Sequence, residues 1–249
     1  MVRNGVRWVR AHPIRSAALA LVLAFVALNV VAYLHAWSMT HFTRGGAKTR
    51  GAERLSPFGK VAVLFTGVRV PKPANDATPA DFGLPFECHG FPGEAGDLHA
   101  WYVPHPSPKA LVLLLHGYSG CKSSQLREAQ AFHELGCATF LLDFRGSGES
   151  DGWETTVGYE EATDVVRATD YAAAHWPGVP LVLYGQSMGS AAALRAVAVH
   201  GTRPAALVLE NPFDRFLSTV ESRFGLMGVP AFPAARLLVF WGGVQHGIR

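Results

Sequence analysis

The sequence has few charged residues, few cysteines and little net charge, and each shortage narrows the possible classes of protein. Charged side chains make up 16% of the 249 residues and hydrophobic ones 49%, a balance too apolar for an intrinsically disordered chain. The formal net charge is +3, and the arginines gather at the amino terminus, so the sequence does not predict nucleic-acid binding. An odd number of irregularly spaced cysteines argues against a disulfide framework and against a zinc site: Cys88, Cys121 and Cys137.

One long apolar run lies near the amino terminus. Residues 16–37 contain no charged side chain, and about 20 such residues cross a hydrocarbon core of roughly 30 Å. A cleaved signal peptide is the alternative, but the run exceeds the roughly 7–15 residues of a usual signal core, and Leu34 is too large for a good cleavage site. We therefore expect a single-pass membrane anchor over 16–37, with the basic tail 1–15 in the cytoplasm and the remaining chain outside it.

Beyond the anchor, the chain changes from linker composition to alternating strands and helices. Residues 38–83 are polar and rich in glycine and proline, as is typical of a linker or amino-terminal extension. Residues 84–249 form the main domain. Its expected strands are 98–103, 109–117, 137–146, 180–185 and 205–210, and its expected helices are 122–136, 158–176 and 190–201. This alternation predicts an α/β protein with a mostly parallel sheet between helices, whose ligands bind at the carboxyl ends of the strands.

The string GQSMG falls at one of these strand ends. It places Ser187 between an expected strand and an expected helix, which is the setting of a G-x-S-x-G nucleophile elbow. The serine of such an elbow occupies a sharp, strained turn, and side chains at the two glycine positions would collide with neighbouring backbone. The alternative is a glycine-rich turn that serves only close packing of helix on strand. We expect Ser187 to be a nucleophile.

A second strand end carries HGYSG, residues 116–120. In a nucleophile-elbow enzyme, one oxyanion donor is the backbone N–H after the nucleophile, here that of Met188. The other donor comes from the loop after an earlier strand, and Tyr118 N–H is our candidate. His116 is a tempting base, but its place before the glycine favours a structural role in shaping the loop.

With these motifs, the sequence resembles the α/β-hydrolase superfamily, especially its serine aminopeptidase-like or monoacylglycerol-lipase-like serine hydrolases. HGYSG, DFRGSGES, GQSMG and LENPF occur in the family's order, and the resemblance covers residues 84–241. It implies that Ser187 attacks an ester, amide or thioester of a small-molecule or lipid-like acyl substrate, through an acyl-enzyme and without metal or organic cofactor. It also implies that Asp143 and Arg145 form an ordered turn and ion pair beside the site and are not catalytic.

The acid and the base that should activate the serine are harder to find. In α/β-hydrolases an acid and then a histidine follow the nucleophile in the chain. Asp214 is a candidate acid, although a loop or helix-capping role suits it better, and Glu210 is better explained as a hydrogen-bond partner of the elbow. His246 is a candidate base outside any family context, whereas His200 is typical of a helix end.

The family resemblance also implies further strand and helix units, which would carry the usual acid and base. We therefore expect the hydrolase domain over 84–249 to be incomplete, with its carboxyl-terminal strands missing. Three interpretations stay open: a membrane-anchored serine hydrolase in a form that lacks acid and base, a non-catalytic binding or scaffold protein, and an enzyme that uses Asp214 and His246. The sequence leaves the oligomeric state open.

Overall fold

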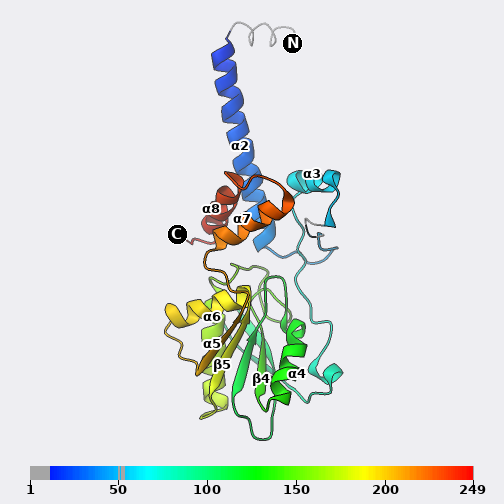
Figure 1. The fold of residues 1–249 in the computed structure, drawn as a ribbon, viewed down its shortest axis with the longest axis vertical. Helices are drawn as coiled ribbons and strands as arrows, with labels where there is room; N and C mark the ends of the chain where they lie inside the picture. The colour runs from blue at the N-terminus through cyan, green and yellow to red at the C-terminus, as the bar shows by residue number, and fades with distance from the viewer. Residues whose placement is uncertain (1–11, 50, 52–53, 249) are drawn as a thin grey trace. The chain divides into compact units, whose positions relative to one another are not determined.

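The computed structural model describes residues 12–49, 51 and 54–248, which form two compact units (Figure 1). The sheet unit comprises Met39–Thr49 and Arg69–Thr219. The helical unit is built from the described parts of Met1–Ser38, Arg50–Val68 and Val220–Arg249. Most of the expected basic tail lies outside the described residues. Much of the expected linker over 38–83 belongs to the sheet unit.

A six-stranded sheet is the frame of the sheet unit, with strand order β1-β2-β4-β3-β5-β6. The strands are β1 (Glu87–Pro92), β2 (Asp97–Val103), β3 (Leu111–Leu115), β4 (Ala138–Asp143), β5 (Leu181–Gln186) and β6 (Ala206–Glu210). The four strands from β4 to β6 pair in parallel, whereas β1 and β2 pair antiparallel. The predicted α/β class with a mostly parallel sheet is therefore confirmed. Strand β1 was not predicted, because this largely exposed edge strand contains glycine and proline and has no apolar run.

Helices cover both faces of this sheet. They are α4 (Leu126–Glu134), α5 (Glu161–His175) and α6 (Met188–Ala198), with short 3₁₀ helices η2 (Pro79–Phe82) and η3 (Lys122–Gln125). The single helix expected over 122–136 is in fact η3 followed by α4. The backbone turns at Gly136, whose φ of 87° suits glycine, and this turn ends the helical segment where the sequence predicts.

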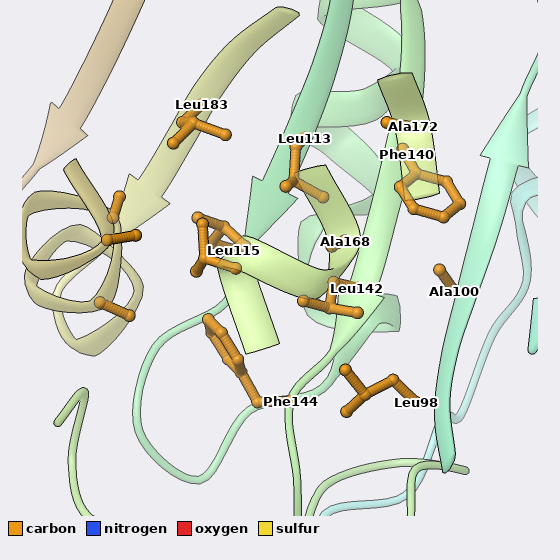
Figure 2. Packing of buried hydrophobic residues seen from close by; sticks show 14 of the residues in the cluster. Leu98, Ala100, Leu113, Leu115, Phe140, Leu142, Phe144, Ala168, Ala172 and Leu183 are labelled. Atoms are coloured by element: carbon orange, nitrogen blue, oxygen red, sulfur yellow. The ribbon is translucent and has the colours of Figure 1, made fainter. Parts of the chain in front are cut away.

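The core lies on both faces of the central strands. On one face, Leu113 and Phe140 pack near Ala168 of α5, as Figure 2 shows. On the other face, Leu114 packs in a second cluster with Ala129 of α4. Successive side chains of β3 are buried on opposite faces, as is typical of a parallel strand between two layers of helices. The sheet therefore holds the carboxyl ends of β3, β4, β5 and β6 at one edge.

The helical unit contains α2 (Pro13–Thr40), α3 (Pro57–Thr66) and α8 (Ala234–Gln245), together with most of α7 (Phe216–Met227). Helix α2 includes the whole expected anchor over 16–37. Of the described helices, it is the one that is long and apolar enough to cross a membrane, and only 6% of its most apolar window is buried. The apolar stretch LLVFW forms part of α8.

Candidate active site

Ser187 occupies the turn between β5 and α6, with φ 50° and ψ −107°. Few residues with a Cβ adopt this conformation, and holding it costs roughly 1–3 kcal/mol. The neighbouring strand holds the turn in place, because the Ser187 N–H donates to the carbonyl of Glu210 at 2.8 Å. The side chain is half-buried, and its hydroxyl does not cap the helix that follows it. The predicted strand, elbow and helix are thus all present, with the hydroxyl group available at the carboxyl edge of the sheet.

Both glycines of GQSMG are required by close backbone contacts. A Cβ on Gly185 would lie 2.6 Å from the carbonyl group of Gly189. A Cβ on Gly189 would lie 2.1 Å from the carbonyl oxygen of Leu115 at the end of β3. Real Cβ atoms do not approach backbone so closely. The glycines therefore allow α6 to start directly against the sheet edge, which positions Ser187 between them.

The HGYSG loop lies against this elbow. A Cβ on Gly117 would be 3.8 Å from the Cβ of Ser187 and 3.6 Å from the carbonyl oxygen of Gln186. Among the described residues, no group accepts a hydrogen bond from the backbone N–H of either Tyr118 or Met188. The Tyr118 hydroxyl donates to the carbonyl of Met39 at 2.5 Å, and burial raises its pKa to about 12. Two unused amide donors therefore belong to the segments that flank the serine.

His116 is fixed inside the loop and is fully buried. Its Nε2 accepts a hydrogen bond from the Phe144 N–H at 3.2 Å, so the proton of the neutral ring is on Nδ1, which donates to the Gly117 carbonyl at 2.9 Å. Burial lowers the pKa of the imidazole, which keeps the ring neutral. Both ring nitrogens are used in holding the loop, which agrees with the structural role favoured by the sequence.

A buried ion pair joins the HGYSG side of the site to the end of β4. Lys122 and Asp143 are both fully buried, and their side chains meet at 2.6 Å. The Lys122 amine also contacts Glu149 and lies 4.5 Å from the centre of the Trp101 ring. Burial opposes ionisation of Asp143, but the charge and hydrogen bonds of Lys122 outweigh it and hold the pKa of this carboxyl below its usual value. This pair ties two strand-end loops together.

Arg145 is paired with a different carboxylate. Its guanidinium donates to Asp164 of α5, with the shortest contact at 2.6 Å, and to the Thr163 hydroxyl at 2.6 Å. The Asp164 carboxylate also accepts the Arg145 backbone N–H at 3.1 Å. The expected ordered turn is therefore present, but Asp143 and Arg145 are each paired with a residue outside it.

Glu210 supports the elbow from β6. Its backbone carbonyl accepts hydrogen bonds from the Ser187 N–H and, at 3.0 Å, from the Ser190 hydroxyl. Its carboxylate accepts a short hydrogen bond from the Tyr184 hydroxyl. These contacts agree with the local role that the sequence favoured for Glu210.

The two candidate partners of the serine lie in different units. Asp214 is exposed in the sheet unit, and its carboxylate accepts hydrogen bonds from the Ser218 hydroxyl at 3.1 Å and the Arg215 N–H at 2.7 Å. These bonds lower the pKa of Asp214, the Ser218 bond most, and they stabilise the start of α7. His246 directly follows α8 in the helical unit. In residues 12–49, 51 and 54–248, no group of three or more His, Cys, Asp or Glu side chains could hold a metal ion.

The sequence did not identify one segment that contacts the site. Residues 39–43, which include the last two residues of α2, belong to the sheet unit. The Met39 carbonyl accepts a hydrogen bond from the Tyr118 hydroxyl, and the Thr40 carbonyl accepts one from the Thr155 N–H at 2.9 Å. The Thr155 hydroxyl in turn lies 3.6 Å from Sδ of Met188. The acceptors in residues 39–43 are backbone carbonyls, which every residue type carries. The sequence therefore could not predict these contacts.

Comparison with known proteins agrees with this geometry. A family model described as serine aminopeptidase, S33, matches residues 106–229. An uncharacterized protein of Mycobacterium tuberculosis is 34% identical over 146 residues, which cover 57% of this chain and 49% of that protein. Human monoglyceride lipase is 32% identical over 115 residues, covering 45% of this chain and 38% of the lipase. The chain thus spans about half or less of the length of these curated relatives.

The fold agrees as well. An esterase of Pyrococcus furiosus superposes with a TM-score of 0.56 at 22% identity, over 69% of this chain and 68% of the esterase chain. This likeness concerns the fold alone, whereas the family model and the lipase relatives concern the sequence around the elbow. The chain belongs to the α/β-hydrolase superfamily, in the branch of serine aminopeptidases and monoglyceride lipases.

Proposed function

We propose that the chain is a membrane-anchored serine hydrolase that cleaves an ester, amide or thioester of a small-molecule or lipid-like acyl substrate through Ser187. The observation that carries this proposal is the strained elbow, where a half-buried serine hydroxyl lies beside the Gly117 loop. A structure that served only packing would have no need of a serine in that conformation. The match to human monoglyceride lipase supports a lipid-like ester as one such substrate.

In the proposed reaction, Ser187 Oγ forms a bond to the substrate carbonyl carbon and gives up its proton. The carbonyl oxygen becomes an oxyanion, to which the unused N–H groups of Tyr118 and Met188 are proposed to donate. The positive end of α6 adds to this stabilisation. Collapse of the intermediate expels the alcohol, amine or thiol, which takes up a proton, and water then releases the acyl group as an acid.

Activation of Ser187 requires a base, and Asp214 and His246 remain the proposed acid and base within this chain. Asp214 would have to leave the hydrogen bonds that it makes at the start of α7. The alternative is a non-catalytic binding or scaffold protein on the same fold.

Labelling with a serine-directed fluorophosphonate tests these roles on the full chain. We expect labelling of the natural chain and none of Ser187→Ala, with the far-ultraviolet circular dichroism unchanged. Loss of labelling in His246→Ala and in Asp214→Asn would support the acid and base, whereas undiminished labelling would remove both. A folded chain that does not label at all would favour the scaffold alternative over the hydrolase.

The proposed anchor has its own test. Helix α2 supports a single span, and the arginines before it support a cytoplasmic amino terminus with the hydrolase domain outside the cytoplasm. We expect the full chain to stay with membranes through a carbonate wash, and protease added to intact cells or spheroplasts to cleave the domain. Release of a shortened chain would instead indicate a cleaved signal peptide.

A further inference from the structure

In the part of the chain that the structure describes, one long stretch in the first half of α2 is exposed throughout. Residues 17–27 are all exposed, and partial burial begins at Leu28. If hydrocarbon begins after the charged Arg15, the stretch that ends at Ala27 covers about 18 Å at roughly 1.5 Å per residue. A hydrocarbon core is about 30 Å thick, so the bare stretch falls short by about 12 Å, and any tilt of the helix increases this shortfall. About eight further residues of α2, from Leu28 onward, must therefore cross lipid while protein packs on them.

Helix α8 is what packs on α2 at that level, as Figure 1 shows. The indole N–H of Trp241 donates to the Asn29 side-chain oxygen at 3.1 Å, and the Trp241 ring meets Tyr33 edge-on at 5.5 Å. The Gln245 amide donates to the Tyr33 carbonyl at 2.9 Å, and the Asn29 amide donates to the Phe25 carbonyl at 2.9 Å. These bonds pair Asn29, the one strongly polar side chain of the apolar run before His35, as a lipid environment requires.

The outer surface of α8 is apolar. Arg236, Phe240 and Val244 recur at every fourth position of α8, so they form one stripe along the helix, and Phe232 lies just before the helix begins. Phe232 is 75% exposed, Phe240 57% and Val244 51%. Such a stripe is unfavourable in water and favourable against acyl chains.

Arg236 is the one charged residue of α8. Its guanidinium lies 6.0 Å from the centre of the Phe232 ring. On insertion scales, a single arginine in a membrane helix costs about 2.5–3.5 kcal/mol, and the apolar residues of α8 oppose this cost.

We propose that α8 is immersed in the bilayer beside α2, in the leaflet that the carboxyl-terminal half of α2 crosses, with Phe240 and Val244 against lipid acyl chains. The inference rests on the membrane anchor proposed above and is independent of the hydrolase chemistry. Its occupant is lipid hydrocarbon. A second copy of the chain or a protein partner over the stripe would be the competing occupants.

The test uses the full chain in phosphatidylcholine vesicles, in a Cys88→Ser background that removes the exposed native thiol. In the variant Phe240→Cys, the introduced thiol carries an environment-sensitive NBD fluorophore, and doxyl-labelled phosphatidylcholine serves as the quencher. The matched control is a cysteine at Leu135, which is 63% exposed at the end of α4 in the sheet unit. The Cys88→Ser chain without an added cysteine is treated with the same fluorophore. Its signal gives the contribution of labelled Cys121 and Cys137.

We expect the label at position 240 to lose most of its fluorescence to doxyl lipid and to resist aqueous dithionite. The label at position 135 should be reduced by dithionite and unaffected by doxyl lipid. A label at 240 that reacts with dithionite overturns the proposal. A label that is shielded from dithionite but unquenched by lipid also overturns it, in favour of a covering protein.

The anchor can fail separately from this inference. Extraction of the unlabelled chain by carbonate would refute the anchor and the immersion together. Retention with an unquenched label at 240 would refute the immersion alone. Labelling of Ser187 by fluorophosphonate reports the hydrolase proposal independently of both.

Discussion

From the backbone conformation of Ser187, we predict that the serine lowers the free energy of unfolding relative to glycine at the same position. Its φ of 50° and ψ of −107° cost a residue with a Cβ roughly 1–3 kcal/mol. Ser187→Gly removes that strain, while the greater freedom of glycine in the unfolded chain takes back about 0.5–1 kcal/mol. The expected net gain in the free energy of unfolding is therefore about 0–2.5 kcal/mol, and each kcal/mol raises Tm by about 2–4 °C in a unit of this size.

Ser187→Ala is the matched control, because it removes the same hydroxyl and keeps the Cβ. Thermal unfolding of the detergent-solubilised full chain, followed by circular dichroism, should give a higher Tm for Ser187→Gly than for Ser187→Ala. Both variants should lose fluorophosphonate labelling. Equal Tm values for the two variants would refute the reasoning. They would mean that a Cβ at position 187 does not strain the backbone.

Three further predictions follow from single contacts. Gly189→Ala places a Cβ 2.1 Å from the Leu115 carbonyl and should cost about 3 kcal/mol in urea unfolding, whereas Gly45→Ala, with no neighbouring atom within 4 Å, should change stability by less than about 0.5 kcal/mol. Equal effects of these two substitutions would contradict the close approach of α6 to β3. The lowered pKa of buried His116 means that the unfolded chain binds a proton below pH 6.5 that the folded chain does not. Relative to His116→Gln, the natural chain should therefore lose stability as the pH falls below about 6.5, by at most about 1.4 kcal/mol per pH unit for this one proton. The same dependence of the free energy of urea unfolding on pH in both chains would exclude this effect. Trp241→Phe removes the donor to Asn29 and should destabilise the packing of α8 on α2 by about 0.6 kcal/mol, measured as increased unfolding in sodium dodecyl sulfate; no change would mean that the bond contributes nothing.

Some features of the site follow from local sequence. Gly185 and Gly189 lie on either side of Ser187, between an apolar strand and an alanine-rich helix. Few backbone conformations other than the nucleophile elbow suit this pattern, so the elbow was predictable. The alternation of apolar strands and helices likewise determined the α/β class, because period and length of apolar runs are local properties. The long uncharged run determined α2 in the same way.

Other features exist only because distant segments meet. The pairing of Lys122 with Asp143 and of Arg145 with Asp164 depends on how strand-end loops and α5 come together, which no spacing encodes. Residues 39–43 reach Tyr118 and Thr155 through backbone carbonyls, and every residue type carries these groups. The partner of Asn29 is likewise decided by tertiary structure, because Trp241 follows it by more than 200 residues. The sequence by itself determined the elbow at Ser187 and the apolar span, because local patterns encode both, while tertiary contacts decided what holds each of them in place.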